Sequence, residues 1–301
     1  MERPEAAGVD VVVATPAFLD LTFVGLEGLP RLNEERFAGD LVRSPGGGGI
    51  TAVGTSRLGL STALAAPLGD DAEGVFLRDV LRGEGVHLVE RICRRTPVTV
   101  VMPAEGDRAM VTVDPGVRAN PADVAALAPR AVSASLDQLY CVPPGVPGYI
   151  SCGDEEARAF ERRPPAGLEN MRALFVSEDE AVALTGAPTL DAAAQQLSGR
   201  VRTLVVTRGA QGAMSITAGS RADVPGIETT PVVDTTGAGD LMVAAYIWAD
   251  LLGAAPAECL RWSVVYAALS ITTPTAVAGA VDAARLIAEG TARGLSVPGP
   301  A

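Results

Sequence analysis

The sequence predicts an α/β fold: a mostly parallel, doubly wound sheet with helices on both faces. Short β-branched runs alternate with helical patterns over most of the 301 residues, which is typical of a parallel sheet with crossover helices. A cluster of strand patterns at 86–113 interrupts this alternation and predicts a small sheet that stands off the main body. We therefore expect one domain over residues 1–301, with a small β lid formed by about 16–44 and 86–114.

The individual elements follow from local patterns. Residues 9–14 and 18–25 are rich in β-branched and aromatic residues and are predicted to be strands. A glycine-rich loop at 44–49 leads into helical spacing, and residues 70–85 form an amphipathic pattern that ends at glycine. The remaining elements are predicted as strands at 61–67, 86–92, 96–102, 108–113, 137–142, 171–177, 201–207, 213–217 and 220–224, and as helices at 121–128, 154–162, 178–186, 189–198, 237–252, 256–272 and 281–290.

Composition excludes several classes of function. Apolar residues make up 48% of the chain and charged residues 20%, which is typical of an ordered globular protein. The net charge of −12 comes with no basic block, so we expect no nucleic-acid partner. No apolar run reaches transmembrane length and the start lacks a secretory pattern, so a cytoplasmic protein without a membrane partner is expected. The four cysteines form no Cys-x-x-Cys pair and His87 is the only histidine, which argues against a Cys/His zinc site.

The segment TTGAGD at 235–240 carries the strongest chemical pattern. Gly237 and Gly239 let successive backbone N–H groups point into one concavity, and the helix that begins there adds the positive end of its dipole. Asp240 then lies in the first helical turn, facing whatever occupies that concavity. A helix cap alone is the simpler interpretation, but glycines on both sides of Ala238 exceed what a cap needs. The pattern therefore favours an anion site with a carboxylate beside it.

Two further glycine patterns are weaker by themselves. The strand at 201–207 ends in Thr207 and is followed by Gly209 and Gly212, as in a loop that approaches a nucleotide, although a tight hairpin loop has the same signature. The glycines at 46–49 precede a helix, and Asp20 lies in the second strand. Glycine permits close approach of a ligand and a carboxylate accepts hydrogen bonds from sugar hydroxyls. Taken alone, a loose loop and a solvated strand residue explain these residues equally simply.

Taken together, these segments resemble the ribokinase-like (PfkB-type) family of sugar and nucleoside kinases. DTTGAGDLMVAA at 234–245 is similar to its C-terminal signature, and PGGGGITAVGTSRLGL at 45–60 is similar to its N-terminal glycine signature. VTRGAQGA at 206–213 resembles the nucleotide loop, and SEDEAVALTG at 177–186 resembles the segment with an Asn-x-x-Glu motif. Asp20 matches the substrate-binding aspartate of the opening strand.

The resemblance implies ATP-dependent phosphorylation of a hydroxymethyl group on a Rossmann-like body with a small β lid. Asp240 would be the general base, and the amides of Gly237, Ala238 and Gly239 would stabilise charge on the transferring phosphoryl group. A homodimer formed through the lid is also implied.

The resemblance also assigns binding residues. The acceptor would contact Asp20, Gly46, Gly47, Gly48 and Ile50, and ATP would contact Thr207, Gly209, Gly212, Gly237 and Gly239. Glu180 would hold Mg²⁺ indirectly, and Asp234 with Thr236 would hold a monovalent cation. Activation by K⁺ is therefore a hypothesis for this chain.

Three departures from the family pattern give further expectations. Ile50 stands where the family has asparagine and cannot hydrogen-bond a sugar hydroxyl, so the substrate is expected to differ. Ser177 replaces asparagine and reaches less far, which is expected to alter magnesium affinity. The stretch at 140–175 is short, and one strand of the sheet is expected to be lost.

A kinase for a sugar or small polyol is the leading hypothesis. The first alternative is a nucleoside kinase of the same fold, which would need an apolar slot for a base, with Ile50 as a contributor. The second is a catalytically weak ligand-binding or regulatory protein on the same scaffold.

Overall fold

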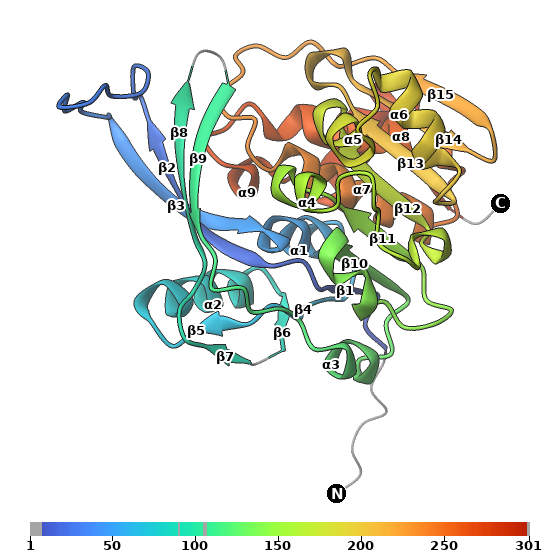
Figure 1. Ribbon diagram of the computed structural model, residues 1–301, viewed down its shortest axis with the longest axis horizontal. Coiled ribbons are helices and arrows are strands. Elements are labelled where there is room, and N and C mark those ends of the chain that lie inside the picture. Colours follow the sequence, from blue (N-terminus) through green and yellow to red (C-terminus); the bar gives the residue numbers. More distant parts are fainter. Residues whose placement is uncertain (1–7, 90, 105–106, 300–301) are drawn as a thin grey trace, which may run out of the picture.

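The computed structural model describes residues 8–89, 91–104 and 107–299. Its strands form a large sheet covered by helices and a smaller sheet that projects to one side (Figure 1). In the described part of the chain the large sheet has nine strands in the order β15-β14-β13-β12-β11-β10-β1-β4-β6. Every neighbouring pair is parallel except β13–β14 and β14–β15, which are antiparallel. The predicted α/β class is confirmed.

The central strands are short and apolar because helices cover both faces of the sheet. β1 and β10 are buried along their whole length, which explains why their sequences lack the alternation of a half-exposed strand. The strands of the large sheet are β1 Val11–Val13, β4 Thr62–Leu64, β6 His87–Leu88, β10 Ala131–Ser135, β11 Gly148–Ser151, β12 Ala173–Ser177, β13 Thr203–Thr207, β14 Ala213–Thr217 and β15 Ser220–Val224.

Two core clusters lie on opposite faces of this sheet. One includes side chains of α1, α2, α7, α8 and α10, and the other includes side chains of α3 to α6. The helical segments are α1 Gly48–Arg57, α2 Ala72–Gly83, α3 Pro121–Ala126, α4 Asp154–Ala159, α5 Glu178–Thr185, α6 Leu190–Ser198, α7 Ala238–Leu251, α8 Pro256–Ser270, α9 Ala276–Gly279 and α10 Ala283–Ala292, with 3₁₀ turns η1 Leu136–Cys141, η2 Leu168–Asn170 and η3 Gly209–Gln211. Within the described residues, no helix has the length and apolar character needed to cross a membrane.

The smaller sheet has the order β3-β2-β8-β9. Its strands are β2 Ala17–Val24, β3 Asp40–Gly47, β8 Val98–Ala104 and β9 Asp107–Val113. β3 runs directly into α1, so the glycines at 46–49 end a strand and begin a helix, and the predicted loop is wrong. Gly47 makes this change of direction with φ of 53°, and a Cβ there would lie 2.8 Å from the carbonyl oxygen of Pro16. Only glycine adopts this conformation in so little space.

Residues 86–92 do not form the single strand that the sequence predicted. His87–Leu88 pairs with β4 at the edge of the large sheet, and Ile92–Cys93 (β7) pairs with Leu68–Gly69 (β5) in a separate two-stranded sheet. Of the predicted lid range 86–114, β8 and β9 lie in the small sheet, and residues 90, 105 and 106 lie outside the described part.

Two predictions in the middle of the chain are also wrong. Residues 136–141 form the 3₁₀ turn η1, and the strand precedes them at Ala131–Ser135. The small residues AVSAS made this strand inconspicuous, although all five are buried. The strand expected to be lost is present as Gly148–Ser151, paired in parallel with β10 and β12.

Candidate active site

The segment TTGAGD leads into α7, which begins at Ala238. Gly237 is the N-cap with φ of 78°, and a Cβ on it would lie 2.4 Å from Ile50 Cδ1. A Cβ on Gly239 would have no atom within 4 Å, so the space in front of this turn is open. The first amides of a helix have no partner within it, and that of Ala238 makes only a long bond of 3.4 Å to the Thr235 carbonyl. The turn thus has the open, amide-lined shape of an anion site.

Asp240 lies in the first turn of α7 and is partly buried. Burial raises its pKa to about 7, with a smaller contribution from the charge of Glu180, while a hydrogen bond from Thr51 and the charge of Arg108 lower it. The Thr51 hydroxyl lies 3.5 Å from Asp240 Oδ1. A carboxylate whose pKa is close to neutrality can both accept and release a proton at physiological pH.

Asp20 lies on β2 of the small sheet, close enough to Asp240 for their charges to interact. Its side chain is 6% exposed, and burial followed by the charges of Asp240 and Asp234 raises its pKa to about 7, with Arg108 opposing. Gly46 makes room for it, since a Cβ at that position would lie 2.1 Å from Asp20 Oδ1. Gly46 therefore lies against the Asp20 carboxylate, whose charge interacts with that of Asp240, and the roles assigned to these residues stay predictions.

Two contributors were missed by sequence reasoning. Arg108 on β9 donates from Nη1 to the Thr235 hydroxyl at 3.0 Å and lowers the pKa of both aspartates. Its signal was a charged residue at the start of the apolar strand pattern RAMVTV. Thr51 follows Ile50 in α1 and had no distinguishing signal of its own.

Ile50 does not offer its side chain to solvent. It is 2% exposed, belongs to the core cluster and lies against Gly237. This placement explains an aliphatic residue at the position, and it argues against Ile50 as a wall of a base-binding slot. Gly48 also has a structural reason, because a Cβ there would lie 2.2 Å from the carbonyl oxygen of Thr15.

The residues before α7 fit a monovalent cation. Asp234 Oδ1 accepts a hydrogen bond from the Thr236 amide at 2.8 Å. Asp234 Oδ2 and the Thr236 hydroxyl are buried and have no hydrogen-bond partner among the described residues. Buried oxygens in this state are satisfied by a cation that prefers oxygen ligands.

Glu180 and Ser177 form a reciprocal cap at the start of α5. The Ser177 hydroxyl accepts from the Glu180 amide at 3.2 Å, and Glu180 Oε2 accepts from the Ser177 amide at 2.7 Å. The pKa of Glu180 is raised, mainly because its carboxylate is buried. In the described residues no group of three or more His, Cys, Asp or Glu side chains could hold a metal. The Glu180 carboxylate is thus engaged in the cap of α5, and an indirect role toward Mg²⁺ stays a prediction.

The loop with Thr207, Gly209 and Gly212 is a tight hairpin between antiparallel β13 and β14. Gly212 has a structural requirement, because its φ is 89° and a Cβ would lie 2.2 Å from the Val224 carbonyl oxygen. Gly209 has φ of 52° and open space around it. The nucleotide role of this loop stays a prediction.

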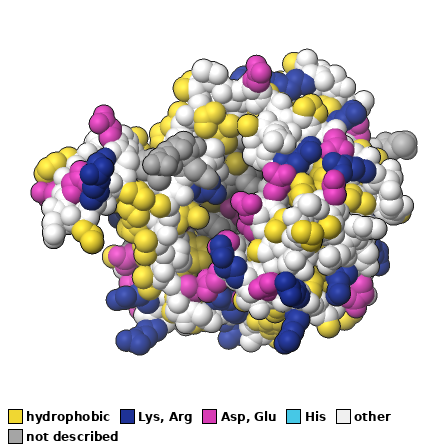
Figure 2. Space-filling model, turned by 45° about the horizontal axis from the view of Figure 1, so that its top comes forward, with side chains coloured by type: hydrophobic (Ala, Val, Ile, Leu, Met, Phe, Trp, Pro, Cys, Tyr) yellow, Lys and Arg dark blue, Asp and Glu magenta, His cyan; other side chains and the backbone are white. Residues whose placement is uncertain are grey.

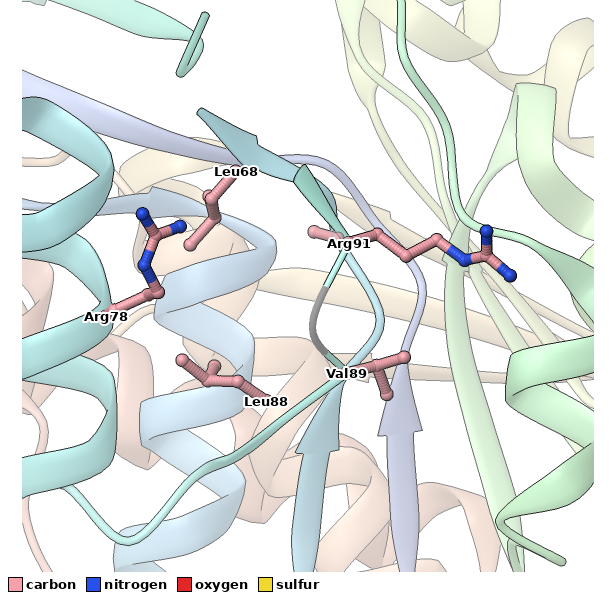
Figure 3. A pocket seen from close by; sticks show the side chains of 6 residues that line it. Leu68, Arg78, Leu88, Val89 and Arg91 are labelled. Atoms are coloured by element: carbon pink, nitrogen blue, oxygen red, sulfur yellow. The ribbon is translucent and has the colours of Figure 1, made fainter. Parts of the chain in front are cut away.

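Figure 2 shows a hollow between the small sheet and the main body, with acidic and basic side chains gathered in it. A separate small pocket, shown in Figure 3, is lined by Ala66, Leu68, Arg78, Leu88, Val89 and Arg91. Arg91 binds Asp123 with two hydrogen bonds, and Arg78 donates to the Gly69 carbonyl at 2.8 Å. Both cations of this pocket are thus used within the protein.

The sequence matches the model of the pfkB family carbohydrate kinases over residues 27–135 and 146–283. The chain belongs to this family. It is therefore a kinase that phosphorylates a sugar or a similar compound. Among curated members, it is 27% identical over 254 residues to acarbose 7(IV)-phosphotransferase of Actinoplanes sp., covering 80% of this chain and 84% of that protein. It is 26% identical over 308 residues to a ribokinase of Arabidopsis thaliana, covering 92% and 80%.

Solved structures of family members agree with the fold. Arabidopsis thaliana ribokinase, solved with ribose and ATP, superposes with a TM-score of 0.79 at 25% identity over 94% of this chain and 99% of that one. The nucleoside kinase of Methanocaldococcus jannaschii gives a TM-score of 0.78 at 17% identity over 95% and 99%, which shows the shared fold alone.

Proposed function

We propose that this kinase transfers the γ-phosphoryl group of ATP to a hydroxymethyl group of a sugar or small polyol. The observation that carries the proposal is the pair Asp20 on β2 and Asp240 on α7, whose charges interact beside the open start of that helix. The similarity to a ribokinase solved with ribose and ATP supports both substrates.

In this proposal Asp240 takes the proton from the attacking hydroxyl. The oxygen–phosphorus bond to the acceptor forms while the bond to ADP breaks, and the amides of residues 237–239 stabilise charge on the phosphoryl group. Asp20 accepts hydrogen bonds from acceptor hydroxyls and so orients the nucleophile. Gly46 and Gly47 let the acceptor approach the backbone, and Thr207 and Gly209 border the nucleotide.

Two cations complete the proposed site. Bound Mg²⁺ would neutralise phosphate charge, with Glu180 holding it through water. The buried oxygens of Asp234 and Thr236 would ligate K⁺, which would steady the segment before α7.

A homodimer through the small sheet is also proposed. The side chains of Met110, Val111 and Val113 on the edge strand β9 are 52%, 61% and 51% exposed, and exposed apolar edge strands favour association. Light scattering should give a dimer at micromolar concentration, and a clean monomer would contradict this.

The function is tested by ATP consumption over a panel that contains ribose, fructose, acarbose and nucleosides. At least one sugar should be turned over, and Asp240→Asn should reduce kcat about 10²–10⁴-fold, as replacement of a general base does. Preference for a nucleoside would favour the first alternative. ATP binding without transfer to any compound would favour a regulatory protein and contradict the proposal.

A further inference from the structure

Helices α1 and α7 pack closely at the start of α7, because a glycine lies at two of their points of contact. A Cβ on Gly54 of α1 would lie 2.7 Å from Leu241 Cδ2 and 2.9 Å from Ala244 Cβ. A Cβ on Gly237, the N-cap of α7, would lie 2.4 Å from Ile50 Cδ1. Small residues at a contact let two helices approach closely. Residues 50–54 of α1 are therefore held directly against the first two turns of α7.

This packing brings the hydroxyl of Thr51 to the carboxylate of Asp240. Thr51 is 2% exposed, and its Oγ1 lies 3.5 Å from two oxygens of Asp240, the side-chain Oδ1 and the backbone carbonyl oxygen. A hydroxyl carries one proton and rotates to suit its acceptors. It can donate to Oδ1 while the carboxylate is charged, and to the carbonyl oxygen once the carboxylate has taken a proton. Hydrogen bonds of catalytic groups are often long before the substrate binds and shorten in the reacting complex.

The hydroxyl acts on Asp240 in a different way from the neighbouring charges. The charged groups that interact with Asp240 are Arg108 on β9, Glu180 on α5 and Asp20 on β2. Burial raises the pKa of Asp240, and of the groups that lower it the hydrogen bond from Thr51 contributes more than the charge of Arg108. A charge acts over a distance and leaves the carboxylate free to rotate, whereas a hydrogen bond depends on angle and holds one oxygen in place.

We propose that Thr51 is a positioning residue that holds Oδ1 of Asp240 and so directs Oδ2 toward the hydroxyl of the acceptor. This role rests on the function proposed for the same site. In the transfer step the acceptor proton goes to Oδ2, the oxygen–phosphorus bond to the acceptor forms, and the bond between the γ-phosphorus and ADP breaks. Thr51 contacts neither substrate and acts through Asp240. A catalytic group misplaced by about 1 Å can cost about 10²-fold in rate, so loss of this one hydrogen bond is measurable.

The competing explanation is that Thr51 only fills space between α1 and α7. Two substitutions separate the explanations, because valine keeps the shape of threonine without the hydroxyl, and serine keeps the hydroxyl without the methyl group. If Thr51 positions Asp240, Thr51→Val should reduce kcat about tenfold with unchanged KM for ATP and for the sugar. Thr51→Ser should keep kcat within about twofold of the wild type, because its hydroxyl remains. If Thr51 only fills space, Thr51→Val should keep the wild-type kcat.

The experiment measures kcat and KM against pH, with ATP and the best sugar of the panel, in the wild type, Thr51→Val, Thr51→Ser and Thr55→Val. Thr55 is a matched control, because it is a fully buried threonine of the same helix whose hydroxyl donates to the carbonyl oxygens of Thr51 and Ala52 at 2.9 and 3.1 Å. Thr55→Val should lower Tm and leave kcat and its pH profile unchanged. The acidic limb of the profile should move up by about one pH unit in Thr51→Val, because a hydrogen bond that favours the charged carboxylate is lost. Thr51→Ser should keep the acidic limb of the wild type.

The pKa of Asp240 gives a readout without turnover. Carbon NMR titration of the aspartate carboxyl groups, with Asp240→Asn to assign the signal, should give a pKa about one pH unit higher in Thr51→Val than in the wild type. No sugar turnover by the wild type would contradict the proposed function, while this titration would still test the contact between Thr51 and Asp240. An unchanged pKa would overturn the proposal. Wild-type kcat in Thr51→Val, or equal losses of kcat in Thr51→Val and Thr51→Ser, would overturn it as well.

Discussion

The two ends of α7 each carry an aspartate, and the surroundings of the two carboxylates differ. Asp250, near the C-terminal end, accepts hydrogen bonds from Arg172 Nε at 2.9 Å and Nη2 at 2.5 Å and from the hydroxyl of Tyr149. Asp240, at the N-terminal end, has a 3.5 Å contact with Thr51 and a pKa raised to about 7. One carboxylate is paired with a cation, and the other is held in a state that disfavours its charge.

The environment of Asp250 suits a stabilising role in the fold, whereas the environment of Asp240 suits proton transfer. A carboxylate near the C-terminal end of a helix interacts unfavourably with the helix dipole. Arg172, the residue before β12, offsets that effect through its ion pair with Asp250 and so connects α7 to β12. The pKa of Arg172 is raised, mainly by its hydrogen bonds with the Asp250 carboxylate. At the other end of α7, burial raises the pKa of Asp240 toward neutrality. This shift does not stabilise the charged form of the carboxylate, but a pKa near neutrality is what a general base requires.

At the N-terminal end of α7, besides the effect of Asp240→Asn, a large effect is expected on the acceptor side. Gly46→Ala should reduce kcat/KM for the sugar about 10²-fold, because the new Cβ would displace the carboxylate of Asp20 and a shift of this size misplaces the acceptor. Gly83→Ala is the matched control, since a Cβ at Gly83 has no atom within 4 Å. Wild-type kinetics in Gly46→Ala would break the assignment of Asp20 to the acceptor.

At the C-terminal end of α7, loss of the Asp250 charge should lower the stability of the fold. Asp250→Asn should lower the free energy of unfolding by about 2 kcal/mol, between the values for exposed and buried ion pairs, and should lower Tm by about 5 °C. Its kcat at 25 °C should equal that of the wild type. Glu258→Gln, which breaks an exposed pair with Arg261 on α8, should change Tm by less than about 1 °C. A loss of kcat without loss of Tm in Asp250→Asn would end the contrast between the two ends.

A smaller effect is expected at Ser177. Ser177→Ala removes the side-chain cap of α5 and should cost about 1 kcal/mol of stability. If Ser177 is a cap and not a metal contact, the magnesium concentration that gives half-maximal activity should stay the same. A shift in that concentration would instead support the interpretation from the family motif.

How much the sequence predicted depends on how local each feature is. The residues 235–240 are contiguous, so the helix start, its glycines and Asp240 could be identified without a fold. Thr51 and Arg108 meet this segment across sequence separations of 189 and 127 residues, and those contacts depend on how the two sheets meet. The helical rotation of α1 could not be read either: it turns Ile50 to the core and Thr51 to Asp240, although the two are adjacent.

Strand β10 shows the same limit for the fold. Its residues are small because neighbouring elements cover both of its faces, so it carried too little hydrophobic signal, and the more apolar residues that follow it were taken for the strand. The large-scale alternation survived this error because parallel strands and crossover helices repeat along the chain.

The charge of Asp240 destabilises the folded protein, because burial disfavours the ionised carboxylate. Its pKa is about 7 in the folded protein against 3.8 for an ordinary aspartate, so the folded state binds a proton that the unfolded chain releases between about pH 4 and 7. Stability from this group therefore falls as pH rises through that range. Asn at this position has no charge to bury.

The direct test is Tm of the wild type and of Asp240→Asn from pH 4 to pH 8. The variant should have a higher Tm than the wild type at pH 8, and the difference in Tm should shrink as the pH falls toward 4. The kcat of the variant should be far below that of the wild type. A variant less stable than the wild type at pH 8 would show that the Asp240 charge supports the fold, as that of Asp250 does, and would contradict the account.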